Sequence, residues 1–418
     1  MRPPNTQSYS PEMKVLLVHN RYQRPGGEDT SLLAEEGVLR AAGHRVVEYF
    51  RHNDEIKHYG LGSRTTLPLR TVWAWDSYRQ IKALLARERP DVAHFQNTFP
   101  LISPAAYYAC READVPVVQT LQNYRLLCPG PSFLNRGRHC EACVGRIPWR
   151  GVVDGCYRHS RAATAPVALM LTVHRWLGTW TDLVDCYIAL TESGRRKFIE
   201  GGLPAEKIAV KPHFVSRDPG IRDGRGEYAL YLGQLSEEKG LRTLLAAWER
   251  LNNRLPLEIA GDGPLRPELE KQASRLGLAE VGRGKPAAPT ISFHGHLPPD
   301  RVTSVMKGAR FLVATSICYE TFGLINVEAF ACGVPVIASR LGAMEEVVTD
   351  GRTGLHFTPG NAEDLAAKVE WAWAHPEEMA AMGRAARAEY EAKYTAEHNY
   401  RMLMEIYRKA IAIHRGGH

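Results

Sequence analysis

Short apolar segments alternate with segments of helical spacing along most of this chain, and few folds accommodate that alternation. Apolar runs of this length are typical of strands buried on both faces of a parallel sheet. A predicted strand at 13–19 is followed by a glycine-rich turn at 24–28, a helix at 31–42 that Gly43 closes, and a strand at 45–50. The sequence therefore predicts an α/β protein built from βαβ units.

The alternation falls into two successive series of predicted strands. One series continues at 92–95, 115–120 and 186–190, and the other contains 228–232, 258–260, 291–294, 311–314 and 334–339. Between them the string 220–226 is polar and rich in glycine, which is typical of a linker. We predict a flexible tail at 1–12, a first domain at 13–215, a linker at 216–226 and a second domain at 227–395, with the helical stretch 396–418 packing back on the first domain.

Length and charge agree with two domains that bind a small anionic ligand. A chain of 418 residues exceeds what one hydrophobic core usually supports. Two Rossmann-like domains would face each other across a cleft and bind ligands beyond the carboxyl ends of their strands. The formal charge of +7, from 53 basic and 46 acidic residues, is too dilute for a nucleic-acid-binding surface and suits an anionic small substrate or membrane surface.

No segment has the pattern of a signal peptide or a membrane span. The first twelve residues contain prolines but no apolar core, and no run of about 18 apolar residues occurs. We therefore expect a cytoplasmic protein, with the inner face of the membrane as a second candidate location. The apolar segment 165–177 is predicted to be a buried or amphipathic helix in preference to an interfacial anchor.

The most specific segment is 315–339, in which a predicted strand is followed by a turn at 320–323, a helix at 324–331 and another strand. A helix that begins in this turn directs its unpaired N–H groups and positive dipole end into the cleft, where they can hold a diphosphate. Glu320 precedes the helix and can face a sugar. Glu328 lies more than one turn inside the helix and can accept hydrogen bonds from ribose hydroxyls.

At these residues the sequence resembles the retaining nucleotide-sugar glycosyltransferases of family four, whose signature is two glutamates with seven residues between them. Similar segments are Ile-Ala-Gly-Asp-Gly-Pro at 259–264, Leu-Gly-Gln-Leu-Ser-Glu-Glu-Lys-Gly at 232–240 and Gly-Arg-Thr-Gly at 351–354. The resemblance extends from Lys14 to about Ala410. It implies the GT-B architecture and transfer of a hexose from a UDP- or GDP-linked donor with retention of configuration.

The resemblance also implies a donor site. The diphosphate would lie against Lys239 and the backbone of 322–326, and fixed cationic and N–H donors would stabilise its departure without a metal ion or another cofactor. Glu320, Lys239 and Gln122 would be catalytic, and the acceptor side would contain Asn97, Asn123 and Arg125. The donor-binding residues would be Gly26, Gly27, Gly233, Gln234, Lys239, Thr321, Phe322, Gly323, Leu324, Asn326 and Glu328.

Three glutamines depart from the family pattern. Relatives commonly carry arginine at the position of Gln234 and histidine at the positions of Gln96 and Gln122. Glutamine forms hydrogen bonds but offers neither a formal charge nor a titratable proton. A weaker site, a different donor sugar and a different acid/base arrangement remain open. Retention can follow from a covalent intermediate or from same-face attack, and the resemblance favours same-face attack, in which the leaving phosphate accepts the acceptor's proton.

Four cysteines are concentrated between 123 and 161, where the helical and strand periodicities fail. Cys128, Cys140, Cys143 and Cys156 have the spacing Cys-x11-Cys-x2-Cys-x12-Cys. This spacing is compatible with a structural Zn²⁺ that orders the loop. Reduced thiols or disulfides are the alternative, because the outer spacings are irregular.

Other functions fit the same two-domain frame. A nucleotide-sugar epimerase and a glycan phosphorylase are alternatives, although a phosphorylase needs a lysine that binds pyridoxal phosphate and no lysine is singled out. A non-catalytic nucleotide-sugar-binding protein is a further alternative, which the three glutamines support. The acceptor would be a glycan, a lipid-linked sugar or a small molecule, and the basic stretch 136–161 suits an anionic acceptor or a membrane surface.

Overall fold

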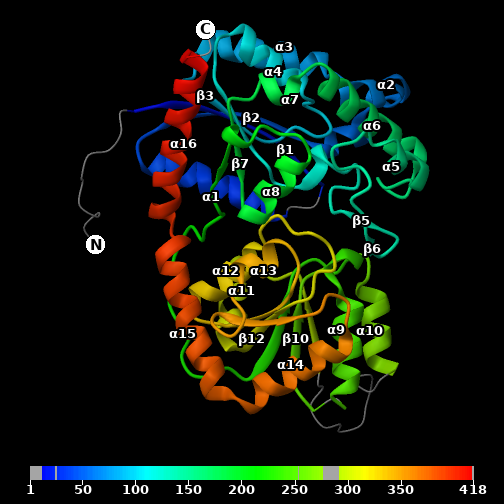
Figure 1. Cartoon of the computed structure of the whole chain (residues 1–418), viewed down its shortest axis with the longest axis vertical. Helices are drawn as coiled ribbons and strands as arrows, with labels where there is room; N and C mark the ends of the chain where they lie inside the picture. The colour runs from blue at the N-terminus through cyan, green and yellow to red at the C-terminus, as the bar shows by residue number, and fades with distance from the viewer. Residues whose placement is uncertain (1–11, 24–25, 253, 276–290, 417–418) are drawn as a thin grey trace.

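The computed structural model describes residues 12–23, 26–252, 254–275 and 291–416, which form two α/β domains placed end to end (Figure 1). The predicted flexible tail lies outside the described residues apart from residue 12, and so do residues 24–25 of the glycine-rich turn and the last two residues. None of the described helices has the length and apolarity that crossing a membrane requires.

A parallel six-stranded sheet forms the centre of the first domain. Its strand order is β2-β1-β3-β4-β7-β8. Successive residues of β1 point to opposite faces, so that Leu16 and Val18 enter one buried cluster while Val15 and Leu17 enter another. The strands are β1 (Lys14–Arg21), β2 (Arg45–His52), β3 (Val92–Asn97), β4 (Val117–Thr120), β7 (Cys186–Ala189) and β8 (Ile208–Val210).

Helices cover both faces of this sheet. They are α1 (Gly27–Ala41), α2 (Leu61–Val72), α3 (Trp75–Glu88), α4 (Ala105–Glu112), α5 (Trp149–Asp154), α6 (Arg161–Trp176), α7 (Thr179–Asp182) and α8 (Glu192–Glu200). The 123–161 stretch, for which no periodicity was found, contains α5, the 3-10 turn η2 (Tyr124–Leu126) and the antiparallel hairpin β5 (Leu134–Asn135) and β6 (Arg138–His139). Other 3-10 turns in this domain are η1 (Asn53–His58) and η3 (Ala205–Lys207).

The second domain contains a parallel sheet of order β11-β10-β9-β12-β13-β14, which is the order of a dinucleotide-binding doubly wound sheet. Its strands are β9 (Tyr228–Leu232), β10 (Leu257–Ala260), β11 (Ile291–Gly295), β12 (Ala309–Ala314), β13 (Val336–Ser339) and β14 (Gly354–Phe357). The helical elements are η4 (Glu237–Lys239), α9 (Leu241–Arg250), α10 (Arg266–Arg275), α11 (Pro299–Gly308), α12 (Leu324–Ala331), α13 (Ala343–Val347), α14 (Ala362–Ala374) and α15 (Pro376–Lys393). The two sheets lie on either side of the predicted linker, and the domain bounds themselves stay predictions.

The last helix, α16 (Ala396–Gly416), leaves the second domain and packs along the first (Figure 1). Its apolar residues recur at helical spacing and join Val15 and Leu17 in one buried cluster. Burial of each large aliphatic side chain there stabilises the packing by about 1.5–3 kcal/mol. Where the chain crosses between the domains, an isolated β-bridge joins Val215 to Thr395. The two crossing segments therefore lie side by side.

A buried ion pair ties α16 to the first domain. Lys211 follows β8 and Glu35 lies on α1, and their side chains are 1% and 4% exposed with 3.3 Å between Nζ and Oε2. Lys211 Nζ also donates to Asn399 Oδ1 of α16 at 3.1 Å. Burial alone would raise the pKa of Glu35, but the charge of Lys211 and contacts with His94 lower it to about 2. Glu35 is therefore held ionised.

A glycine between η4 and α9 is required by close packing. Gly240 has a φ of +70°, and a methyl group added there would lie 2.0 Å from the carbonyl oxygen of Thr315. Gly351 has a φ of +72°, but a methyl group added there would meet no atom within 4 Å. A substitution at Gly351 therefore measures only the cost of the positive φ. We expect Gly351→Ala to lower the free energy of unfolding by about 1–2 kcal/mol. Gly240→Ala should cost clearly more in denaturant unfolding, and an equal loss in both variants would show that the Thr315 contact is not tight.

Candidate active site

The two strands at the switch point of the second sheet, β9 and β12, are followed by turns that meet at one ion pair. Lys239, at the end of η4, donates from Nζ to Glu320 Oε1 at 2.5 Å, and Ser316 Oγ donates to the same oxygen at 2.7 Å. The two charged side chains remain 29% and 18% exposed. The structure thus brings together the predicted catalytic residues Lys239 and Glu320.

The charges of this pair stabilise each other. Burial acts to raise the pKa of Glu320, but the positive charge and hydrogen bond of Lys239, with the bond from Ser316, hold it below its usual value. Burial acts to lower the pKa of Lys239, and the negative charge of Glu320 raises it instead. Both groups are therefore ionised at neutral pH, and the ammonium retains N–H donors for a further anion.

The start of α12 lies directly after Glu320. Gly323 has a φ of +80° there, and an added methyl group would lie 2.8 Å from Met344 Sδ and 2.9 Å from Asn326 Nδ2. Only glycine fits this position without movement of its neighbours. The backbone N–H of Asn326 already donates to the carbonyl oxygen of Gly323 at 3.0 Å. Leu324 begins the helix, whose first N–H groups are the ones suited to an anion.

Glu328 lies within α12, and its side chain is half-buried. This burial raises the pKa of Glu328 to about 7. A carboxyl group in such surroundings is protonated for part of the time at neutral pH. It becomes a better hydrogen-bond acceptor when it ionises.

The turn before α12 faces the first domain. Thr321 Oγ1 donates to the backbone oxygen of Gln122 at 2.8 Å, and Thr191 Oγ1 donates to the backbone oxygen of Thr321 at 3.3 Å. The ring of Phe322 packs edge-on against His213 at a centroid distance of 5.4 Å. Gln122, the third predicted catalytic residue, therefore lies beside the turn that carries Glu320.

The side-chain amide of Gln122 belongs to a buried chain of hydrogen bonds. Its Nε2 donates to Gln96 Oε1 at 2.6 Å, and its Oε1 lies 3.0 Å from His213 Nε2. Burial, together with the positive charge of Lys211, lowers the pKa of His213 to about 3. The imidazole is therefore neutral and can donate its Nε2 proton to Gln122.

The predicted acceptor-side residues line one cavity of the first domain together with Gln122. Asn97 accepts from the backbone N–H of Phe99 at 3.0 Å, and the guanidinium of Arg125 lies 4.0 Å from the centre of the Phe99 ring. Asn123 accepts from the backbone N–H of Arg125 at 3.1 Å and caps η2. The structure thus confirms that these side chains are neighbours, while their contacts with an acceptor stay a prediction.

Glu28 was not among the site residues predicted from the sequence. It lies in the first turn of α1, and its Oε1 accepts from Asn123 Nδ2 at 2.8 Å. Its Oε2 is buried, and no partner for it was found among the described residues. Burial raises the pKa of Glu28. Its position directly after Gly26 and Gly27 was a usable signal, but an acidic residue there is equally typical of an ordinary helix start.

Two predicted donor contacts are less clearly placed. Gly26 and Gly27 are exposed at the start of α1, and the backbone N–H of Gly26 donates to Asp29 Oδ2 at 3.1 Å. This end of the helix is thus already capped by its own carboxylate. Gln234 is exposed at the end of β9, whereas Gly233 lies in a tight approach to Gly261. Contacts of these residues with a donor stay predictions.

A further contact between the two domains was not predicted from the sequence. Glu346 on α13 accepts from the backbone N–H groups of Glu192 and Ser193 at 2.7 Å each. These N–H groups belong to the start of α8, where a carboxylate complements the helix dipole. The side chain of one domain therefore caps a helix of the other.

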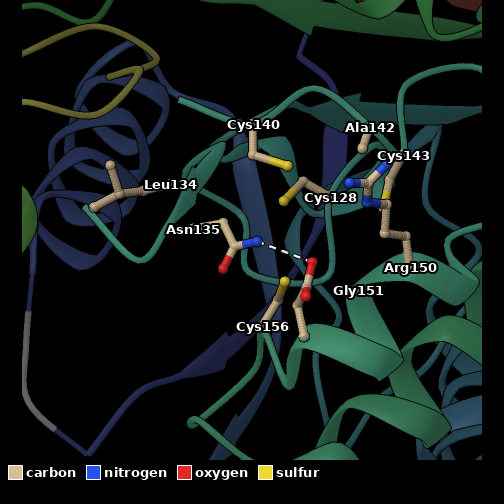
Figure 2. A pocket seen from close by; sticks show the side chains of 10 residues that line it. Cys128, Leu134, Asn135, Cys140, Ala142, Cys143, Arg150, Gly151 and Cys156 are labelled. Atoms are coloured by element: carbon tan, nitrogen blue, oxygen red, sulfur yellow. Dashed lines mark hydrogen bonds between the residues drawn. The ribbon is translucent and has the colours of Figure 1, made fainter. Parts of the chain in front are cut away.

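The four cysteines lie outside this site. They line a separate small cavity in the 123–161 stretch (Figure 2).

Comparison with known proteins identifies the family. The Glycosyl transferase 4-like domain matches residues 27–213, and the family Glycosyl transferases group 1 matches residues 216–389. The chain belongs to the family-four glycosyltransferases. The predicted α/β fold of GT-B type, with two Rossmann-like domains and a returning helix, is confirmed.

Three relatives illustrate the range of this glycosyltransferase family. The glycogen synthase of Mycobacterium tuberculosis is 30% identical over 311 residues, which are 72% of this chain and 64% of that protein. The GDP-mannose-dependent alpha-(1-6)-phosphatidylinositol monomannoside mannosyltransferase of Mycolicibacterium smegmatis is 35% identical over 48% of this chain and 52% of its own. The chain thus spans less than two thirds of both relatives. The structure of Anabaena HepE with UDP and glucose has a TM-score of 0.66 at 19% identity and covers 94% of this chain and 99% of its own, which shows the shared fold.

The raised pKa of Glu328 predicts a pH-dependent stability for this protein. The folded carboxyl group binds its proton more tightly than the unfolded one, so the stability that the protonated form contributes is lost as pH rises from about 4.5 through 7. Glu328→Gln keeps a neutral group at all pH values. We expect the melting temperature of the natural protein to fall relative to that of Glu328→Gln across this range. A difference that does not change with pH would contradict the assignment.

Proposed function

We propose that this protein transfers a hexose from a UDP- or GDP-linked sugar to an acceptor hydroxyl with retention of configuration and without a metal ion. The observation that carries the proposal is the Lys239–Glu320 pair at the switch point of the second sheet, beside the start of α12 and facing Gln122. A nucleotide diphosphate sugar has both parts that such a site can bind. Its diphosphate is anionic, and its sugar is rich in hydroxyls.

Each side chain has a definite role in this proposal. Lys239 and the N–H groups at the start of α12 stabilise the negative charge that develops on the leaving diphosphate. Glu320 accepts hydrogen bonds from sugar hydroxyls while it holds Lys239 in position. Glu328 accepts bonds from the ribose. These fixed charges and dipoles supply the stabilisation for which other transferases use a metal ion.

Same-face attack fits the groups present near the turn. Gln122 and the neutral His213 offer amide and imidazole hydrogen bonds, and neither is an ionised nucleophile. Glu28 is the carboxyl group found on the first-domain side, and its raised pKa makes it a poorer nucleophile. We therefore assign the acceptor's proton to the leaving phosphate oxygen, and Gln122 to the orientation of sugar hydroxyls.

Two of the relatives support the choice of donor. HepE was crystallised with UDP and glucose, and the mycolicibacterial mannosyltransferase depends on GDP-mannose. A thermal-shift panel of UDP-, GDP-, ADP- and dTDP-sugars identifies the donor, because a ligand that binds the folded state raises its melting temperature.

Slow donor hydrolysis then tests the enzyme directly. We expect Glu320→Gln and Lys239→Ala to lower the rate of nucleotide release by about 10²-fold or more, because each removes a group that stabilises the transition state. Glu345→Gln, on the exposed side of α13, is the matched control and should keep the natural rate. If the protein binds a donor but releases no nucleotide with any acceptor tested, a nucleotide-sugar-binding protein is favoured instead. That alternative has support in the amide of Gln122, which already donates to Gln96 and contacts His213.

The acceptor is proposed to lie at a membrane. The outward face of α6 is apolar although it is exposed, with Leu169 at 49% and Trp176 at 84% exposure. Exposed Trp149 and Ile147 lie nearby, because Arg175 at the end of α6 donates to the backbone oxygen of Arg146 at 2.7 Å. Residues 136–175 contain seven arginines and two acidic residues. Apolar side chains among surplus positive charge suit an anionic bilayer.

This surface also lies close to the proposed acceptor cavity. Met170, on the inward face of α6, lines that cavity, while Leu169 points outward from the next position. The helix at 165–177, predicted to be buried or amphipathic, is therefore buried on one face only. A lipid-linked acceptor could stay in the bilayer while its sugar reaches the cavity.

Vesicle sedimentation tests the membrane surface. We expect the natural protein to bind vesicles that contain phosphatidylglycerol and to be released as the salt concentration rises, because the arginine contribution is screened. The double variant Leu169→Asp and Trp176→Asp should lose most of this binding, whereas Ile221→Asp, an equally exposed change outside the surface, should keep it. Equal binding by both variants would refute the surface.

A further inference from the structure

Four cysteine side chains from separate parts of the 123–161 stretch surround one cavity. Cys128 follows η2, Cys140 follows β6, Cys143 lies three residues later and Cys156 follows α5. Figure 2 shows all four around the cavity, with Arg150 beside Cys143. All four are free thiols, and two of them are buried. The first-domain chemistry proposed above uses none of them.

Short backbone contacts hold these cysteines in place. The N–H of Cys140 donates to the backbone oxygen of Phe133 at 2.8 Å, and that of Cys156 donates to Gly151 at 3.0 Å. The segment at Gly130 approaches the backbone of Cys156 so closely that a methyl group on Gly130 would lie 3.1 Å from its oxygen. The fold therefore holds the backbone of Cys140 and Cys156 in place at this cavity.

The thiols themselves are not yet in a ligand arrangement. Among the described residues, no three His, Cys, Asp or Glu side chains stand where they could already hold a metal ion. A change of χ1 rotamer moves a cysteine sulfur by about 3 Å without moving the backbone. Side chains on a fixed ring of backbone positions can therefore turn toward a common centre when a cation enters.

We propose that Cys128, Cys140, Cys143 and Cys156 bind a structural zinc ion that orders the 128–156 loop. Four sulfur ligands, two of them in a Cys-x2-Cys turn, are the set that tetrahedral Zn²⁺ takes in structural sites. The four thiols release four protons on binding, and the product carries a charge of −2. Arg150 lines the cavity and partly neutralises this charge, as do the exposed arginines around the loop.

Metal binding would also stabilise the contacts that this loop makes with the segment before Glu320. The loop contacts the residue before Glu320, because the N–H of Tyr319 donates to the backbone oxygen of Ser132 at 3.3 Å. The rings of Phe133 and His139 pack edge-on against Tyr319 at centroid distances of 5.7 and 5.5 Å. Disorder of the loop would remove these contacts from the donor side of the cleft.

The metal content of the full-length protein tests the site without an activity assay. Protein that is purified under reducing conditions without chelator should contain about one zinc ion per chain by elemental analysis. Substitution with Co²⁺ should produce the thiolate-to-metal charge-transfer absorption of a tetrahedral sulfur site. A strong chelator should lower the melting temperature, and added zinc should restore it.

Variants and mass spectrometry separate the site from its alternatives. The double variant Cys140→Ala and Cys143→Ala should lose the zinc, whereas Cys110→Ala, at a buried thiol outside the loop, should keep it. If the double variant fails to fold, the metal content of the natural protein still decides. Natural protein with no metal and four alkylatable loop thiols would overturn the proposal. A mass lowered by the loss of two or four hydrogens would overturn it in favour of disulfides.

Discussion

The buried pair of Lys211 and Glu35 determines how the first-domain side of the cleft is built. The carboxylate of Glu35 lies 3.1 Å from His94 Nδ1, and the hydroxyl of Tyr407 lies 2.8 Å from the same nitrogen. Removal of either member of the pair would leave the other charged in a low-dielectric interior, which is strongly destabilising. The pair therefore requires α16 to be docked, since Asn399 and Tyr407 complete the surroundings of its charges. The C-terminal helix is thus part of the first domain in an energetic sense.

Charged side chains differ in their exposure between the two sides of the cleft. On the first-domain side, the Lys211–Glu35 ion pair is buried, and hydrogen bonds join the amides of Gln96 and Gln122 to the neutral imidazole of His213. On the second-domain side, Lys239 and Glu320 remain partly exposed and can accept new partners. This division suits a reaction in which one side stabilises a departing anion while the other orients neutral hydroxyls.

The parts that could be predicted depend on local pattern, and the parts that were missed depend on how distant segments meet. Alternating apolar segments predicted both sheets, and the family resemblance assigned Lys239 and Glu320 to one site, where the structure joins them by a hydrogen bond. The local signal at Glu28 and Glu346 is ambiguous, since an acidic residue near a helix start is common because of the helix dipole alone. Their roles appear only when Asn123 and the start of α8 are brought to them by the fold. Donor contacts at Gly26 and Gly27 were also predicted from a local feature, the glycine-rich turn before α1. In the structure Asp29 caps this helix and already accepts from the backbone N–H of Gly26.

The paired crossover at Val215 and Thr395 constrains how the two lobes can move. Two covalent connections that run side by side can act as a hinge, about which one lobe rotates relative to the other. On the opposing surfaces, the Glu346 carboxylate accepts two hydrogen bonds from the start of α8. Rotation of one lobe away from the other would break this contact together with those that Thr321 and Phe322 make with the first domain.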